Sequence, residues 1–192
     1  MRATRPYDGD VGRVVWINGC FSSGKTSVAT LLLERLPDSF LLDPDVIGSM
    51  LRYLVPPRAY PEDFQDLRLW RRFTRAAVVD AAERSDGVVV VPMTIARPEY
   101  FDEVIAPIGR RVPLDHFTLT ASRETILERE GSRDDETGNW ARKTVDWVLP
   151  ALADDRFAVH IDAESQTVAE VADDIVRRIA EPVDQAARGA RR

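Results

Sequence analysis

Residues 19–26 of this 192-residue chain have the types and the spacing needed to bind phosphate groups. Their sequence, GCFSSGKT, fits the pattern G-x-x-x-x-G-K-[ST], in which a loop turns its backbone N–H groups around phosphate oxygens. Glycine at positions 19 and 24 permits the backbone angles and the close approach that such a loop needs. Lys25 is one of only two lysines in the chain, and we expect its compact ammonium group to reach the β- and γ-phosphates of a nucleotide.

The sequence on both sides of this loop fits the order strand, loop, helix that the pattern requires. Val14 to Asn18 is a short apolar run of the kind found in buried parallel strands, and Ser27 to Leu36 repeats apolar residues at helical spacing. The helix would direct its free N–H groups at bound phosphates, and the hydroxyl of Thr26 would ligate Mg²⁺. We predict that ATP is bound by Gly19, Cys20, Phe21, Ser22, Ser23, Gly24, Lys25, Thr26 and Ser27.

Two aspartates, Asp43 and Asp45, directly follow a second predicted strand, Ser39 to Leu42. Ligands of parallel α/β sheets sit beyond the carboxyl ends of the strands, so both carboxylates can face the transferred phosphate. We predict that Asp45 positions the acceptor hydroxyl or removes its proton as a general base, and that Asp43 helps Thr26 to hold Mg²⁺. The strand Val88 to Val91 ends without a carboxylate, which strengthens the case for Asp43 and disfavours a motor-type ATPase. The alternative is that both aspartates only cap the following helix.

Further polar residues fall where an acceptor molecule could lie. Thr94 and Arg97 come just after the Val88 to Val91 strand, and a polar, aromatic stretch at 60–66 precedes a long predicted helix. Arg97 could instead be a solvated loop residue, and Trp70 could belong to the core. We predict substrate contacts for Asp45, Asp63, Gln65, Asp66, Trp70, Thr94 and Arg97.

Arg129 and Arg133 lie at a charged, glycine-bearing segment without periodicity, residues 131–139. In phosphoryl-transfer enzymes a mobile lid brings arginines onto the transferring phosphate. We therefore predict a lid at 131–139 and catalytic roles for Arg129 and Arg133, together with Lys25 and Asp45. The alternative is a charged surface loop in a chain that is rich in arginine.

Predicted strands and helices alternate along the chain, which favours an α/β fold with a parallel sheet covered on both faces. No repeat or linker divides the chain, so we expect one domain over residues 1–192, with flexible ends at 1–12 and 182–192. We expect five strands, at 14–18, 39–42, 88–91, 114–120 and 157–161. We expect helices at 27–36, from about 44 to 54, and at 67–84, 99–108, 122–129, 140–149 and 167–179.

The composition argues against several classes of protein. The net charge of −6 disfavours a nucleic-acid partner, because a surface that follows phosphates is normally basic. A single cysteine, Cys20, excludes an internal disulfide and fits a reducing cytoplasm. No apolar run is long enough to span a bilayer. We expect a cytoplasmic monomer or homodimer whose partner is a small molecule.

With these residues identified, the sequence resembles the tunicamycin-resistance ATP-binding protein family of P-loop proteins over about residues 14–180. The segments DFQD (63–66) and VPMT (91–94) are far more particular to that family than the P-loop. More distantly, the chain is similar to chloramphenicol phosphotransferases and shikimate kinases. The matching segments are residues 16–26, FLLDPD (40–45), DFQDL (63–67) with Trp70-Arg71, VPMT (91–94), HFTL (116–119), ASRET (121–125) and HID (160–162).

The resemblance implies a P-loop NTPase with a three-layer fold like that of nucleoside monophosphate kinases. In the more distant relatives an aspartate at the position of Asp45 contacts the acceptor hydroxyl. The resemblance also implies a role in resistance to a uridine-containing antibiotic such as tunicamycin. Three hypotheses follow: an ATP-dependent phosphotransferase that modifies the drug, an ATP-binding protein that sequesters it without chemistry, and a metabolic nucleoside or sugar kinase.

Overall fold

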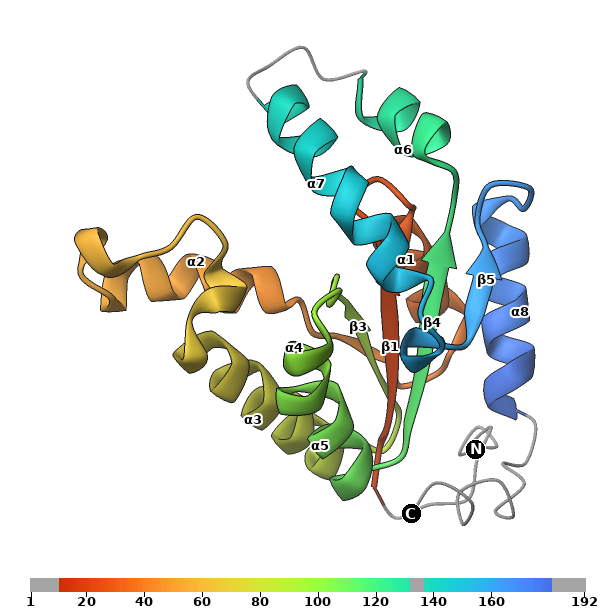
Figure 1. Ribbon diagram of the computed structural model, residues 1–192. Coiled ribbons are helices and arrows are strands. Elements are labelled where there is room, and N and C mark those ends of the chain that lie inside the picture. Colours follow the sequence, from red (N-terminus) through yellow and green to blue (C-terminus); the bar gives the residue numbers. More distant parts are fainter. Residues whose placement is uncertain (1–10, 132–136, 181–192) are drawn as a thin grey trace.

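The computed structural model describes residues 11–131 and 137–180 of the chain (Figure 1). Residues 1–10 of the predicted flexible end at 1–12, all of the predicted flexible end at 182–192, and residues 132–136 of the predicted lid, with Arg133, lie outside the described residues. The strands are β1 (Arg13–Gly19), β2 (Phe40–Leu41), β3 (Val88–Pro92), β4 (Leu114–Thr120) and β5 (His160–Asp162). The helices are α1 (Lys25–Arg35), α2 (Pro44–Leu54), α3 (Arg68–Arg84), α4 (Pro98–Glu103), α5 (Ile105–Arg111), α6 (Arg123–Glu130), α7 (Thr137–Leu152) and α8 (Val168–Ala180).

The five strands form one sheet in the order β2-β3-β1-β4-β5, and every neighbouring pair is parallel. The carboxyl ends of the strands therefore share one edge, toward which the arrowheads of β4 and β5 point and above which α6 and α7 lie (Figure 1). The loop that follows β1, the middle strand, opens onto this edge. The predicted parallel five-stranded sheet is confirmed.

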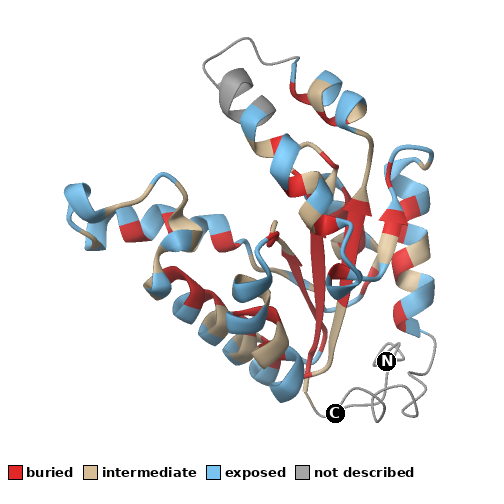
Figure 2. Cartoon of the chain, viewed as in Figure 1, coloured by how far each residue is buried: buried red, intermediate tan, exposed pale blue. Residues whose placement is uncertain are grey.

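Alternate residues of β1 enter two separate cores, as the period of a strand requires. Val14 and Trp16 pack with apolar residues of α3, α5, α6 and α7 on one face, whereas Val15 and Ile17 pack with residues of α1 and α8 on the other. All four side chains are fully buried, and the strands form the buried interior in Figure 2. The result is a helix–sheet–helix arrangement of three layers, as predicted.

Two predicted elements differ from the structure. The helix expected at 99–108 is two helices, α4 and α5, because Pro107 has no N–H to give to the carbonyl of Glu103. Arg75 donates to that carbonyl instead, at 3.3 Å. The strand expected at 157–161 begins only at His160, since Phe157 lies in a short 3-10 turn and is fully buried. Among the described residues, no helix has both the length and the apolar character that crossing a membrane requires.

Candidate active site

The loop between β1 and α1 has the backbone geometry that its glycines predict. Gly19 and Gly24 have φ angles of 141° and 98°, and Ser22 has φ 54°. A Cβ atom at Gly19 would lie 2.6 Å from Ser23 Oγ and 2.8 Å from the carbonyl oxygen of Leu119. Position 19 therefore accepts only glycine, for reasons of both backbone angle and space.

The start of α1 is built to receive an anion. Within the described part of the chain, no side chain caps this helix and its first turn carries no acidic residue. A Cβ atom at Gly24, its N-cap, would meet nothing within 4 Å. Ser23 Oγ is buried and has no hydrogen-bond partner among the described residues. Free helical N–H groups, open space and an unpaired hydroxyl together fit bound phosphate.

Lys25 is the first residue of α1, and its side chain turns back into the loop. Its Nζ atom donates to the carbonyl oxygens of Gly19, at 3.1 Å, and Cys20, at 2.7 Å. Burial lowers the pKa of Lys25 to about 8, against the opposing effects of Cys20 and of the Asp45 carboxylate. Burial also raises the pKa of the Cys20 thiol to about 11, so this cysteine is an inert part of the core.

Three aspartates meet beside this loop. Asp43 caps α2, because its Oδ1 accepts from the backbone N–H of Asp45 at 2.9 Å. Asp45 projects from the first turn of α2, and Asp63 precedes the short 3-10 turn at 64–66. Burial raises the pKa of Asp45, and the charges of Asp43 and Asp63 raise it further while Lys25 lowers it. The ammonium group of Lys25 and the carboxylate of Asp45 thus interact electrostatically.

The segment after β3, which contains Thr94, links the P-loop to the segment at residues 63–66. Thr94 Oγ1 donates to the carbonyl oxygen of Gly19 at 2.7 Å, and Gln65 Nε2 donates to the carbonyl oxygen of Thr94 at 2.8 Å. Asn18 holds the neighbouring backbone, since its side chain bonds both the N–H and the carbonyl of Ile95. Sequence reasoning missed Asn18, although a polar residue that ends an apolar strand next to the loop is a usable signal.

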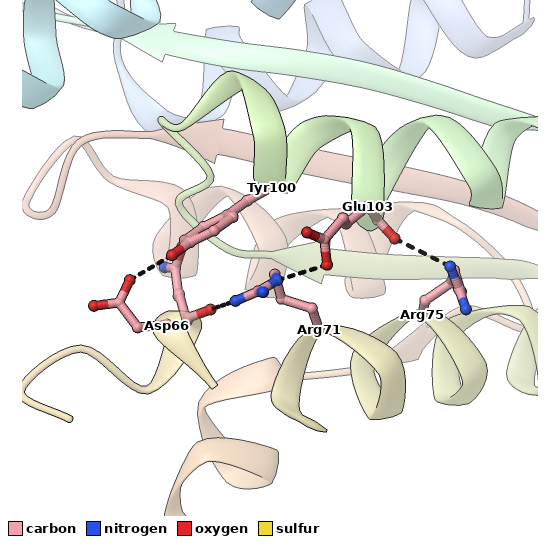
Figure 3. Close-up of polar contacts among 6 residues, drawn as sticks. Asp66, Arg71, Arg75, Tyr100 and Glu103 are labelled. Carbon is pink, nitrogen blue, oxygen red and sulfur yellow. Dashed lines mark hydrogen bonds and ion pairs between the residues drawn. The ribbon is translucent and has the colours of Figure 1, made fainter. Parts of the chain in front are cut away.

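A second polar network holds Gln65 and Asp66 from the side of α3 and α4 (Figure 3). The buried guanidinium of Arg71 donates to the backbone carbonyl of Gln65 and, at 2.9 Å, to Glu103. It also lies over the ring of Tyr100, 4.3 Å from the centroid, and the Tyr100 hydroxyl donates to Asp66 at 2.5 Å. Sequence reasoning missed Arg71 and Tyr100, because their partners come from three different segments.

Two of the predicted site residues have other partners. Trp70 is fully buried and its indole N–H donates to the carbonyl oxygen of Pro44 at 3.0 Å. The prediction that Trp70 contacts a substrate is therefore wrong in this structure: it lies in the core beneath α2. Arg129 donates to the carbonyl oxygen of Ala163, in the loop after β5, at 3.0 Å. Ser22 Oγ donates to Glu130, so the loop also contacts the end of α6.

The remaining site residues lie at the surface. Thr26, Ser27, Asp43, Asp45, Asp66 and Arg97 are exposed, so the burial that raises the pKa of Asp45 is only partial. Arg97 lies over two rings, 5.2 Å from the centroid of Trp147 and 5.7 Å from that of Tyr100. The described residues contain no cluster of three or more His, Cys, Asp or Glu side chains placed to hold a metal ion. The hydroxyl of Thr26 and the carboxylate of Asp43 are oxygen ligands that suit a Mg²⁺ ion bound mainly by phosphates and water.

Comparisons with known proteins agree with this geometry. Residues 14–153 match the family model of an AAA domain, and no curated protein matches the chain. The tunicamycin resistance protein of Deinococcus radiodurans is similar in structure, with a TM-score of 0.75 and 29% identity over 88% of this chain and 97% of that one. The resemblance found in the sequence is thereby confirmed.

Two kinases share the fold at lower identity. The gluconokinase of Sinorhizobium meliloti has a TM-score of 0.62 and 19% identity, covering 93% of this chain and 97% of that one. The shikimate kinase of Acinetobacter baumannii has a TM-score of 0.57 and 17% identity, covering 87% and 92%. Together with the sheet order and the loop geometry, they confirm an α/β P-loop kinase fold.

Proposed function

This chain belongs to the AAA domain family, and we propose that it is an ATP-dependent phosphotransferase that phosphorylates a hydroxyl group of a uridine-containing nucleoside antibiotic, such as tunicamycin, and so confers resistance. The similarity to a tunicamycin resistance protein supports this class of acceptor, and the P-loop kinase fold supports the reaction. One observation carries the proposal: Thr94 links the two sides of the site, since its hydroxyl donates to the P-loop carbonyl of Gly19 at 2.7 Å and its own carbonyl accepts from Gln65 at 2.8 Å.

On the nucleotide side, the residues of the P-loop bind and orient. The N–H groups of residues 19–26 and of the first turn of α1 surround the phosphates. Lys25 would exchange its contacts with the Gly19 and Cys20 carbonyls for phosphate oxygens, and Thr26 and Asp43 would hold the Mg²⁺ that accompanies ATP. Bound ATP with its Mg²⁺ supplies the phosphoryl group and spreads the charge that develops on it.

On the acceptor side, Asp45 holds the hydroxyl that is to be phosphorylated and takes its proton as the new oxygen–phosphorus bond forms. Its raised pKa makes it a stronger base than an ordinary aspartate. Asp63, Gln65 and Thr94, fixed by the bonds that run to Gly19, line the same edge of the sheet. In this proposal Asp66 and Arg97 bind the rest of the acceptor.

The arginines of α6 and the lid act together with these groups. Arg129 contacts the loop after β5, at the edge of the sheet opposite β2, and in this proposal it helps to orient the nucleotide. We propose that Arg133 closes onto the transferring phosphate, as sequence reasoning predicts, and that residues 131–139 exclude water.

Incubation with ATP, Mg²⁺ and a panel of nucleoside antibiotics, followed by mass analysis, tests the proposal. One antibiotic should gain the mass of a single phosphoryl group while ADP accumulates in equal amount. Lys25→Ala serves as the control without transfer, because it removes the ammonium group of the P-loop, and its melting temperature checks that the fold is kept. Saturable, ATP-dependent binding of the antibiotic without any gain in mass would instead establish a sequestering protein.

A further inference from the structure

An exposed tryptophan lies beside the acceptor side of the site. Trp147 is on α7, where its neighbours Val145 and Val148 are buried in the core, yet 42% of the Trp147 surface is exposed. Large aromatic side chains with an exposed face are well suited to contact ligands, since they offer a large apolar area with few rotatable bonds. The exposed part of Trp147 is therefore free to contact a ligand.

Arg97 connects Trp147 to the residues proposed to bind the acceptor. Its guanidinium lies 5.2 Å from the centroid of the Trp147 ring and 5.7 Å from that of Tyr100. Arg97 is also close enough to Asp63 for its charge to act on that carboxylate, and Asp63 acts in turn on Asp45. Trp147 of α7 thus lies near the residues proposed to bind the acceptor, although it is far from Asp45 in the sequence.

We propose that Trp147 and Arg97 form a subsite for a planar, unsaturated ring that bears hydrogen-bond acceptors, as a pyrimidine base does. This inference rests on the proposed function and names the residues that would recognise the base of its acceptor. The exposed part of the indole offers a π-face for the ring to stack on. The guanidinium, held against the two aromatic side chains, offers N–H donors to carbonyl oxygens at the edge of the ring.

The chemistry of the subsite separates two kinds of acceptor. A nucleoside has both the π-face and the carbonyl groups, so it can use Trp147 and Arg97 together. A polyol such as gluconate or shikimate has no aromatic ring, and it would leave the indole in contact with water. The subsite therefore selects against the acceptors that a metabolic sugar kinase would use.

Calorimetry with the full chain and a non-hydrolysable ATP analogue tests the inference. The probes are uridine and tunicamycin, which carry a planar pyrimidine ring, and two acceptors without one: gluconate, which is an open chain, and shikimate, whose cyclohexene ring is not aromatic. The variants are Trp147→Leu, which removes the ring, and Trp147→Phe, which keeps one. Phe73→Leu is the matched control, because Phe73 is a similarly exposed aromatic residue (39%) on α3.

We expect the parent chain to bind a ring-bearing probe at least tenfold more tightly than either polyol. Trp147→Leu should weaken that binding roughly tenfold or more, Trp147→Phe should retain most of it, and Phe73→Leu should match the parent, with the affinity for the ATP analogue unchanged throughout. Equal affinities for rings and polyols, no binding of either ring-bearing probe, or a Trp147→Leu variant that binds like the parent would each overturn the subsite.

Mass analysis of the same mixtures with ATP in place of the analogue separates this inference from the proposed function. Ring binding that depends on Trp147, without transfer of a phosphoryl group, would support the subsite and end the phosphotransferase proposal. Transfer to uridine or tunicamycin at a rate that does not depend on Trp147 would support the proposed function and overturn the subsite, whereas transfer to a polyol would favour a metabolic kinase.

Discussion

The indole nitrogen of Trp70 donates a 3.0 Å hydrogen bond to the carbonyl oxygen of Pro44, the residue that precedes Asp45. Trp70 belongs to α3 and is fully buried, whereas Pro44 is the first residue of α2. The bond thus fixes the start of α2 against α3. Trp70 therefore helps to position Asp45, because it holds the first turn of the helix that carries this residue.

We expect Trp70→Phe to damage both stability and turnover. The smaller ring still packs near Phe64, whose ring centroid lies 5.3 Å from that of Trp70, but the carbonyl of Pro44 loses the indole N–H and keeps only the bonding that its place at the start of α2 provides. Loss of this hydrogen bond should cost about 0.5–1.5 kcal/mol, and a shifted Asp45 should lower kcat about tenfold or more. Urea unfolding and steady-state kinetics measure the two effects. A variant with parental stability and kcat would show that the bond does not hold α2.

The P-loop could be predicted from the sequence because all of its chemistry lies in consecutive residues. Gly19, Gly24 and Lys25 have their roles fixed by local backbone geometry, and the structure has the predicted strand and helix around them. The cap formed by Asp43 could be predicted for the same reason, since its partner is two residues away.

Roles that depend on tertiary contacts could not be predicted in this way. Trp70, Arg71 and Asn18 find their partners across elements that are separate in the sequence, at Pro44, Glu103 and Ile95. The late start of β5 has a similar cause, because the apolar Phe157 packs edge-to-face against Phe101, 5.6 Å away, rather than continuing a strand.

Nucleotide affinity should fall at alkaline pH because of Lys25. Its pKa is lowered to about 8, so above pH 8 a growing fraction of the free protein carries a neutral amine. Phosphates require the ammonium form, and the dissociation constant for ATP should rise roughly tenfold between pH 8 and pH 9 to 9.5. Calorimetry should also show uptake of a proton on binding near pH 8.5. In Lys25→Arg the affinity should be lower but independent of pH in this range, and the same slope in that variant would assign the effect to another group.

Arg71→Met should loosen the segment that carries Asp63 and Gln65. The methionine fills the space of the arginine stem but leaves the Gln65 carbonyl without its donor. We expect faster hydrogen exchange at residues 63–67 and 93–95 and an acceptor KM raised about tenfold, with unchanged affinity for ATP. Arg75→Met is the control, since Arg75 lies one turn further along α3 and contacts only the backbone of Glu103 in the network of Figure 3. Similar exchange in both variants would refute a specific role for Arg71.

His116 should make the fold sensitive to acid. Its Nε2 lies 3.2 Å from the amide nitrogen of Asn18, which can only donate, so this atom is an acceptor and the ring is neutral. Burial lowers the pKa of His116 to about 4. In the unfolded chain the imidazole of His116 takes up a proton below about pH 6.5, whereas in the folded protein it stays neutral down to about pH 4. The contribution of His116 to the free energy of unfolding is therefore fully present above pH 6.5 and is lost as the pH falls toward 4.

Between pH 7 and pH 5 the titration of His116 should lower the free energy of unfolding by about 2 kcal/mol. Urea unfolding at the two pH values measures it, with His116→Gln as the comparison. The glutamine cannot titrate, so its variant should lose about 2 kcal/mol less over the same interval. An equal loss in both proteins would mean that His116 is not kept neutral by the fold.

Asp45→Asn separates catalysis from sequestration. The substitution keeps the size of the side chain and most of its hydrogen bonds, but it removes the charge and the proton acceptor. A phosphotransferase that uses Asp45 as its base should lose roughly a hundredfold to ten-thousandfold in kcat. The affinity for ATP should change much less than kcat, because in our proposal Asp45 binds the acceptor and its charge acts on Lys25 only as one of several groups.

The pH dependence of kcat offers a second way to test whether Asp45 is the base. Since the pKa of Asp45 is raised by burial and by the neighbouring carboxylates, kcat should fall as pH decreases through that raised pKa, and this acid limb should vanish in Asp45→Asn. Drug affinity by calorimetry and resistance of cells that express each form complete the comparison. Retained drug binding with lost resistance would support catalysis, because a protein that only sequesters the drug has no proton to remove. Retained binding with full resistance would exclude Asp45 as an essential base and favour sequestration.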